Sequence, residues 1–164
     1  MTRVQLPLRS QAENGAQLCF RCGLCCDGSV FDRTPLSTEE VERAQTYGLE
    51  VMTVIGVDGS QASSAQQPCP LYRDGRCSTH GDWRPAACSA YACRLLDSYL
   101  VGERSLDACL DVILTMRETV KEVAAQSLRD DAADSRQTPE SLLARAALQR
   151  LEHKYFIRGG RPSA

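Results

Sequence analysis

The chain has 164 residues, with 19 basic residues against 21 acidic ones and a formal net charge of −2 at pH 7. Such a balance gives no broad basic surface for nucleic acid or anionic lipid, so we expect neither as a partner. No stretch approaches the roughly 18 uninterrupted apolar residues of a membrane span, and the opening "MTRVQLPLRS" has no apolar core of a signal peptide. The sequence therefore predicts a cytoplasmic protein.

The first part of the chain has the signals of one short helix and one strand. Residues 1–18 are polar without clear periodicity, and we expect a loose lead-in. In "LSTEEVERAQTYG" a helix is predicted from Ser37 to about Tyr47, with Ser37 as N-cap, Glu40 at the capping-box position and Gly48 as the stop. The segment "EVMTVIGVDG" predicts a strand that ends in a turn. The "SQASSAQQP" run that follows predicts a surface loop.

The rest of the chain changes from a punctuated segment to helices. Proline and glycine among the cysteines of residues 69–93 exclude long regular elements there. Beyond them, apolar residues at helical spacing predict a helix over about 105–128. Thr138 as N-cap and Pro139 at the first helical position begin a second helix over about 139–156. We expect the two helices to pack as an antiparallel hairpin, followed by a frayed "RGGRPSA" tail.

The cysteines are the main chemical signal of this sequence. There are nine, an odd number that argues against a complete set of intramolecular disulfides, and eight of them fall between Cys19 and Cys93. The cytoplasm keeps thiols reduced and available to metals. Large apolar residues are few, and binding of a structural metal supplies on the order of 10 kcal/mol of folding free energy. Metal would therefore compensate for a thin core.

The densest group of cysteines, "CFRCGLCC", has the spacing of an iron-sulfur site. Three thiols at two-residue gaps, Cys19, Cys22 and Cys25, can converge on one centre. Bacterial ferredoxins use this C-x2-C-x2-C start and draw a further ligand from a distant cysteine followed by proline, as Cys69-Pro70 is here. The sequence thus predicts a four-iron four-sulfur cluster on Cys19, Cys22, Cys25 and Cys69.

Zinc is the direct alternative, because four-thiolate zinc sites are also built from closely spaced cysteines. Eight cysteines would satisfy two zinc ions, and soft thiolate donors suit zinc and iron-sulfur centres alike. A thioredoxin-like pair is disfavoured because no βαβ pattern precedes Cys19. The C-x3-C-x2-C spacing of a radical S-adenosylmethionine site fails at Ser29. The spacing leaves iron and zinc open.

The three segments "CFRCGLCC", "PCPLYRDGRCSTH" and "WRPAACSAYAC" resemble the YkgJ-type CxxCxxCC family of zinc- or iron-chelating domains. The resemblance covers roughly residues 18–94, and the "PLSTEEVERA" segment resembles the short helix between the family's cysteine blocks. The resemblance implies that the metal ligands are Cys19, Cys22, Cys25, Cys26, Cys69, Cys77, Cys88 and Cys93.

The chain departs from the family pattern at Ser89 and Ala92, where relatives often have arginine and proline. These changes bear on local turn shape and on hydrogen bonding around the ligands rather than on ligation. Some relatives, such as flagellin lysine methylases, join a similar module to methyl transfer. This chain has no convincing nucleotide-binding glycine loop, so methylase activity is not carried over.

Five residues besides the eight clustered cysteines have predicted roles. Cys109 lies on an apolar helical stripe and is predicted to pack in the core. His80 could replace one thiol as a ligand or donate a hydrogen bond to a bound sulfur, but a local structural role is preferred for it. Arg84 would offset the charge of the thiolates or form a surface salt bridge, and Trp83 and Tyr91 are predicted to shield the site from water.

We expect a small, α-rich, irregular domain that folds around metal at residues 1–98, with a helical hairpin at residues 99–164 packed on it. The predicted function is metal binding by an iron-sulfur cluster or zinc, for electron transfer or redox sensing. The alternative is a zinc-stabilised module whose hairpin binds a protein partner. A third possibility, an enzyme that uses the cluster to bind substrate, has no substrate signal in the sequence.

Overall fold

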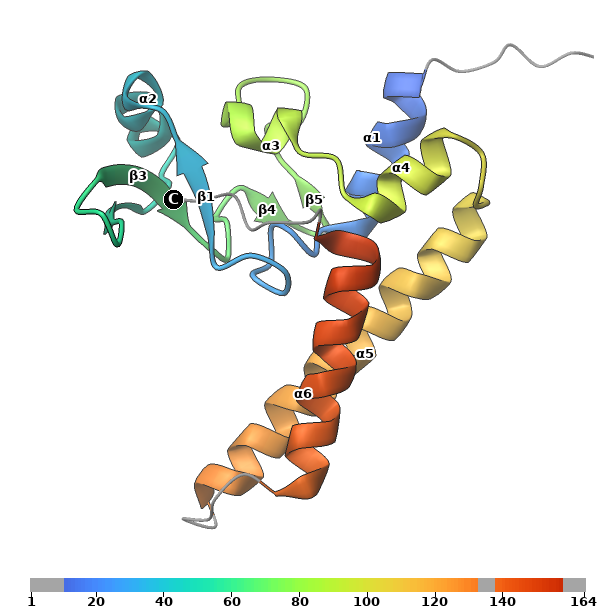
Figure 1. The fold of residues 1–164 in the computed structure, drawn as a ribbon. Coiled ribbons are helices and arrows are strands. Elements are labelled where there is room, and N and C mark those ends of the chain that lie inside the picture. The colour runs from blue at the N-terminus through green and yellow to red at the C-terminus, as the bar shows by residue number, and fades with distance from the viewer. Residues whose placement is uncertain (1–10, 133–137, 158–164) are drawn as a thin grey trace, which may run out of the picture.

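The computed structural model describes residues 11–132 and 138–157. Helices predominate in this part of the chain and a small sheet accompanies them (Figure 1), so the predicted α-rich fold is confirmed there. Among the described residues, no helix is long and apolar enough to cross a membrane. In chain order the elements are α1 (Gln11–Cys22), β1 (Arg33–Leu36), η1 (Thr38–Glu40), α2 (Val41–Thr46), β2 (Val51–Ile55), β3 (Gln61–Gln66), β4 (Tyr72–Arg73), β5 (Arg76–Cys77), α3 (Ala86–Ala90), α4 (Arg94–Leu100), α5 (Leu106–Ala132), α6 (Pro139–Leu151) and η2 (Glu152–Phe156).

Helix α1 replaces the loose lead-in that was predicted before the first cysteines. Residues 1–10 lie outside the described chain, but from Gln11 the segment is helical. Leu18 is buried and packs into a core shared with α4 and α5. Tertiary packing of this kind supplies most of the stability of short helices, and the local pattern gave little sign of it. As a result, Cys19 and Cys22 lie on the last turn of a helix.

The short helix between the cysteine blocks is confirmed as η1 followed by α2. The backbone N–H of Ser37 donates to the Glu40 carboxylate at 3.0 Å, as the capping box requires. The same carboxylate also accepts a hydrogen bond of 2.7 Å from the backbone N–H of Ala86 at the start of α3. Gly48 ends the helix in the left-handed region, at φ 78°, where glycine has no steric penalty. Glu40 therefore joins the starts of two helices.

The sheet is antiparallel with strand order β1-β3-β2, which corrects one expectation. The predicted strand is confirmed as β2, but the "QASSAQ" segment, expected to be a surface loop, is the central strand β3. Its Ser64 and Ala65 are buried. Small side chains carry little strand propensity by themselves, and here pairing with a neighbour on each edge determines the conformation.

The segment between Cys69 and Cys93 contains only short elements, as predicted. β4 and β5 form a two-residue pairing, α3 has five residues, and Tyr91 and Ala92 lead directly into α4. In this part of the described chain, turns join the short elements and determine the path of the backbone.

The C-terminal helices form the predicted hairpin and project away from the sheet (Figure 1). The N-cap prediction is confirmed, because the Thr138 hydroxyl accepts a hydrogen bond from the backbone N–H of Ser141 and Pro139 opens α6. The Arg145 guanidinium donates to the Ser127 hydroxyl across the pair at 2.8 Å. Helix α5 extends to Ala132, a few residues past the predicted end. The predicted tail, residues 158–164, lies outside the described chain.

Two small hydrophobic cores hold the molecule together. The first lies among α1, α4, α5 and η2, and its buried residues are Leu18, Leu24, Leu95, Leu96, Cys109, Ile113, Met116 and Phe156. The second lies between the sheet and α2, and its buried residues are Leu36, Ala44, Leu49, Ala65 and Leu71. The first core draws on both sides of residue 98, and the proposed boundary at that residue stays a prediction.

Candidate metal centre

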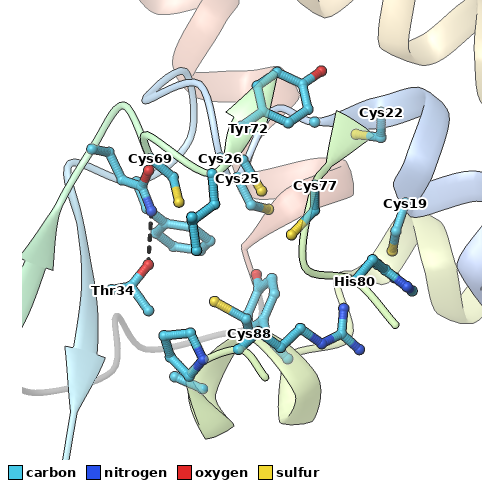
Figure 2. Close-up of a pocket in the computed structure, with 18 of the residues that line it drawn as sticks. Cys19, Cys22, Cys25, Cys26, Thr34, Cys69, Tyr72, Cys77, His80 and Cys88 are labelled. Atoms are coloured by element: carbon cyan, nitrogen blue, oxygen red, sulfur yellow. Dashed lines mark hydrogen bonds between the residues drawn. The ribbon is translucent and has the colours of Figure 1, made fainter. Parts of the chain in front are cut away.

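A cavity of about 400 Å³ lies between the two cores and is lined by leucines from both. Figure 2 shows thiols on several sides of it. The cysteines that line it are Cys19, Cys22, Cys25, Cys26, Cys69, Cys77, Cys88 and Cys93. The ninth, Cys109, is fully buried in the first core, so its predicted packing role is confirmed. The fold therefore brings the eight predicted ligands to one place.

Four of these cysteines come together where α1 meets α4, and we name them the first thiol set: Cys19, Cys22, Cys25 and Cys93. Cys19 and Cys22, three residues apart on α1, share one helix face. Gly23 ends the helix in the left-handed region, at φ 64°, and this turn leads the chain to Cys25. Cys93 is the N-cap of α4, and its sulfur accepts a hydrogen bond of 3.3 Å from the backbone N–H of Leu96.

The thiols of the first set act on one another electrostatically. Burial raises the pKa of Cys22 to about 12, and the nearby Cys93 and Cys19 thiolates add to this rise. Burial also holds the pKa of Cys25 well above its usual value, again with Cys22 and Cys93 among the contributing charges. Without a cation in the cavity these thiols therefore keep their protons at neutral pH. A bound cation would reverse that preference.

The second thiol set consists of Cys26, Cys69, Cys77 and Cys88. A hydrogen bond of 2.8 Å from the backbone N–H of Cys69 to the carbonyl of Cys26 ties two of its segments together. Cys77 ends β5 and Cys88 lies on α3. Cys25 and Cys26 are consecutive residues, yet they belong to different sets.

The charges around the second set follow the same logic. Burial raises the pKa of Cys26 to about 12, with Cys88, Cys69 and Cys77 as the next causes. Desolvation raises the pKa of Cys88 to about 11, although a hydrogen bond from Thr34 acts to lower it. The Gln67 side-chain amide donates to the Thr34 hydroxyl at 2.8 Å, the dashed line at Thr34 in Figure 2. The Thr34 proton is then free to be donated to Cys88.

This grouping differs from the predicted four-cysteine cluster in one ligand. Cys19, Cys22 and Cys25 do lie together, but the fourth cysteine beside them is Cys93. Cys69 lies with the second set instead, because the turn after β3 pairs its backbone with Cys26. Spacing in the sequence does not report which loops meet, and the cluster on Cys19, Cys22, Cys25 and Cys69 stays a prediction.

Arg84 and His80 line the same cavity. The Arg84 guanidinium donates to the Ser89 hydroxyl at 2.9 Å, and its charge acts to lower the pKa values of both Cys19 and Cys88. The Arg84 charge thus lowers the pKa of one thiol in each set. Desolvation, and then the charge of Arg84, lower the pKa of His80, which keeps that imidazole neutral at pH 7.

The aromatic residues near the cavity divide into those that line it and one that does not. Tyr91 lines the cavity, packs edge-on against Phe31, and donates its hydroxyl proton to the carbonyl of Phe156. Trp83, expected to shield the site, is absent from the lining; it stacks against Tyr47, with the ring centroids 4.9 Å apart. Its role is to support the second core.

Three residues around the thiols were missed by sequence reasoning. Thr34 and Gln67 come from strand regions without a motif, and Arg117 comes from the middle of α5. The Arg117 guanidinium donates a hydrogen bond of 2.5 Å to the carbonyl of Cys22. No local pattern marks such residues, because each acts across a tertiary contact; only a set of aligned relatives could have pointed to them.

The donor chemistry of the cavity fits zinc or an iron-sulfur centre. Thiolates are soft donors that favour these metals over calcium or magnesium, and eight of them share one partly apolar cavity. Among residues 11–132 and 138–157, no group of three or more Cys, His, Asp or Glu side chains is already arranged to hold a metal ion. The fit therefore rests on the identity and grouping of the donors.

Comparisons with known proteins give one match. The CxxCxxCC family model, described as a "putative zinc- or iron-chelating domain", matches residues 18–124. This range contains all eight cavity cysteines and most of α5. No curated protein and no solved structure matches the chain.

Proposed function

Because this chain belongs to the CxxCxxCC family of zinc- or iron-chelating domains, we propose that it holds two metal centres, one on each thiol set. The first centre would use Cys19, Cys22, Cys25 and Cys93, and the second Cys26, Cys69, Cys77 and Cys88. The observation that carries this proposal is the pattern of charge effects and backbone pairing among the eight cavity thiols: Cys22 is affected by Cys93 and Cys19, and Cys26 by Cys88, Cys69 and Cys77. Cys25 lies where the two groups meet, because it is affected by Cys22 and Cys93 and also by Cys26.

We favour iron-sulfur centres, such as four-iron four-sulfur clusters, over single zinc ions. Four sulfurs held about 2.3 Å from one zinc ion leave no free volume inside the coordination shell. The eight thiols, however, share with apolar side chains a cavity of about 400 Å³, which has room for a larger group. An iron-sulfur cluster fills such space with its own sulfide ions and supplies one-electron redox chemistry when bound.

The residues around the cavity suit this use. Leu95, Tyr91 and Phe156 limit the access of water. The Leu96 N–H and the Thr34 hydroxyl hydrogen-bond Cys93 and Cys88, and hydrogen bonds to the ligand sulfurs are among the factors that set the reduction potential of such a centre. The reducing cytoplasm keeps thiols available to metal. We place the protein there, in electron transfer or redox sensing.

Elemental analysis with an absorption spectrum on protein purified without oxygen tests this proposal. Iron with matching sulfide, and broad visible absorption that bleaches on reduction, is the expected result. One or two zinc ions per chain with no visible band would reject the redox function but keep the two-centre assignment. Protein that carries neither iron nor zinc, and takes up neither after reconstitution, would reject both.

A second function is favoured by a different part of the molecule. The helical hairpin exposes three leucines towards its far end, with exposed fractions of 71% for Leu128, 52% for Leu142 and 71% for Leu143. Exposed large apolar side chains are a feature of protein-binding surfaces when they form a patch. We therefore keep a zinc-stabilised module, whose hairpin binds a protein partner, as the alternative. Two results together would favour this module. The protein would hold zinc without redox activity, and it would lose the binding of its protein partner on Leu143→Ser but not on Cys109→Ala.

A further inference from the structure

The end of helix α1 leaves a backbone acceptor that the helix itself cannot satisfy. The last carbonyls of a helix have no intrahelical donor, and the left-handed Gly23 turns the chain away directly after Cys22. The Cys22 carbonyl is therefore free to accept a hydrogen bond from elsewhere. Because Cys19 and Cys22 lie on this last turn, whatever binds the carbonyl also fixes the direction of two thiols of the first set.

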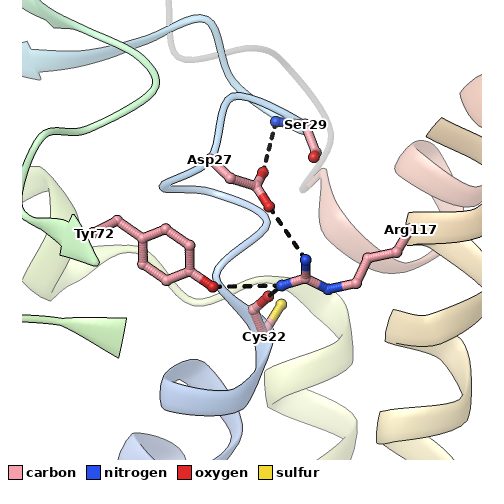
Figure 3. A network of polar contacts seen from close by, with 5 residues as sticks. All are labelled: Cys22, Asp27, Ser29, Tyr72 and Arg117. Carbon is pink, nitrogen blue, oxygen red and sulfur yellow. Dashed lines mark hydrogen bonds and ion pairs between the residues drawn. The ribbon is translucent and has the colours of Figure 1, made fainter. Parts of the chain in front are cut away.

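Arg117 of α5 makes this contact (Figure 3). One terminal nitrogen of its guanidinium donates to the Cys22 carbonyl at 2.5 Å and lies 3.4 Å from the Tyr72 hydroxyl. The other lies 3.7 Å from the Asp27 carboxylate, whose second oxygen accepts a hydrogen bond of 2.9 Å from the backbone N–H of Ser29. One side chain thus contacts both ends of the loop that carries Cys25 and Cys26.

The hydrogen bond to Cys22 is the stronger of these contacts. A charged donor at short distance gives one of the stronger hydrogen bonds in proteins, and a cation is favoured at a helix C-terminus. The ion pair with Asp27 is long, and both side chains are partly exposed, so solvent screens it. Loss of Arg117 should therefore loosen the end of α1 first and the Asp27 side of the loop second.

We propose that Arg117 is a positioning residue for the first metal centre, which it reaches through the Cys22 carbonyl rather than through a thiol. The inference rests on the proposed function, because it assumes a metal on Cys19, Cys22, Cys25 and Cys93. Arg117 fixes the last turn of α1 against α5 and so presents two ligands in a set direction. Among the described residues, Arg117 makes no hydrogen bond to a thiol or a carbonyl of the second set. Its nearest contacts to that set are the Tyr72 hydroxyl and the Asp27 carboxylate.

The test uses the full chain, freed of metal and titrated with Co²⁺, whose thiolate charge-transfer absorption reports the sulfurs bound. We compare Arg117→Gln, Arg117→Lys and the matched control Lys121→Gln, since Lys121 is an exposed residue one turn further along the same helix. Removal of a residue that orients a ligand commonly weakens metal binding about 10- to 100-fold. Arg117→Gln should weaken one of two centres by that factor and change the other less than about twofold. Arg117→Lys keeps the charge and one donor and should recover part of the loss.

Amide hydrogen exchange on the same metal-free proteins adds a readout independent of metal. Peptides that cover residues 22–30 should exchange faster in Arg117→Gln than in the parent or in Lys121→Gln. This measurement also shows whether each variant is folded, and Arg117→Lys keeps the test valid if the glutamine variant unfolds.

The outcomes separate the two proposals. If the parent binds Co²⁺ at two centres and Arg117→Gln behaves like Lys121→Gln, or weakens both centres equally, the positioning role is wrong while the metal function stands. If the parent binds no Co²⁺ and takes up neither iron nor zinc after reconstitution, the metal function fails, and the positioning role fails with it.

Discussion

The backbone N–H of Cys69 donates a hydrogen bond of 2.8 Å to the carbonyl of Cys26, so two cysteines far apart in the sequence lie next to each other. The cluster predicted on Cys19, Cys22, Cys25 and Cys69 would instead place Cys69 with the first thiol set. The two assignments can be distinguished by the amount of bound metal, because removing two ligands of one centre and removing one ligand from each of two centres cause different losses.

Paired serine substitutions should reveal which cysteines share a metal. Cys69→Ser and Cys93→Ser should each remove about half of the bound metal, since each breaks a different four-thiolate set. The double variant should lose nearly all of it, whereas Cys69→Ser with Cys88→Ser should lose no more than either alone. Metal per chain, from elemental analysis of purified protein, decides between these patterns. Equal retention in the two double variants would contradict the division into two sets.

Gly23→Ala should be strongly destabilising, because its φ of 64° disfavours a side chain and a Cβ there would overlap the Tyr72 hydroxyl. The left-handed backbone alone costs about 1–2 kcal/mol, and the overlap adds to it. Urea unfolding of the metal-free protein measures the loss. Repeating Gly23→Ala in a Tyr72→Ala background should recover the part due to the overlap. No recovery there would mean that the backbone term dominates.

Metal-free protein should lose stability as the pH rises above about 9. Burial raises the pKa of Cys22 and Cys26 from 9.0 to about 12 in the folded chain. The folded state therefore holds these protons more tightly than the unfolded state. That contribution is fully present below pH 9 and is lost as the pH rises towards 12.

The metal-loaded protein should behave in the opposite way. Metal binding displaces protons from the thiols, so metal affinity and the stability that it adds increase with pH between about 6 and 9. Urea midpoints of both forms across pH 6 to 10, with reductant present, check the two trends. A metal-free protein whose midpoint rises between pH 9 and 10 would show that the buried thiols are not protonated as described.

Thr34→Val should affect the second centre selectively. The substitution keeps the side-chain shape but removes the hydroxyl that hydrogen-bonds Cys88. In the metal-free chain the pKa of Cys88 should rise further, and its alkylation at pH 9 should slow a few-fold. Peptide mass spectrometry after timed iodoacetamide treatment gives the rate for each cysteine. Thr53→Val, on the exposed face of β2, is the control, and a slowing there equal to that of Thr34→Val would remove the role given to Thr34.

Cys109 offers a test of the one thiol that is outside the cavity. It is fully buried in an apolar core, so Cys109→Ala should leave metal content unchanged and cost roughly 1 kcal/mol. Cys109→Ser should be worse by about 1–3 kcal/mol, because it buries a hydroxyl with few partners. Metal analysis and denaturant unfolding of both variants check this, and loss of metal in Cys109→Ala would show that the cysteine is a ligand.

The sequence was most informative where local chemistry determines structure. Ser37, Glu40 and Thr138 marked helix starts correctly because a cap is satisfied within a few residues of itself. The eight cavity cysteines could be named because three cysteine segments resemble the CxxCxxCC family, and the family model matches the range that contains them.

The sequence was least informative where partners come from distant segments. β3, with its serines and alanines, becomes a strand only because β1 and β2 pair with it. The choice of Cys93 over Cys69 for the first set depends on where α4 begins relative to α1. Arg117 reaches Cys22 from another helix, and its own surroundings in the sequence give no sign of that contact.

The position of the cavity between two small cores has a consequence for how long the protein survives in a cell. With metal bound, eight ligands would join the segments that surround the two cores. Without it, those segments are held mainly by turns and a few hydrogen bonds, and local opening there exposes cleavable chain. Proteolysis of an opened form follows its equilibrium population. Chains that fail to acquire metal should therefore be degraded first, so that the amount of protein follows the supply of its metal.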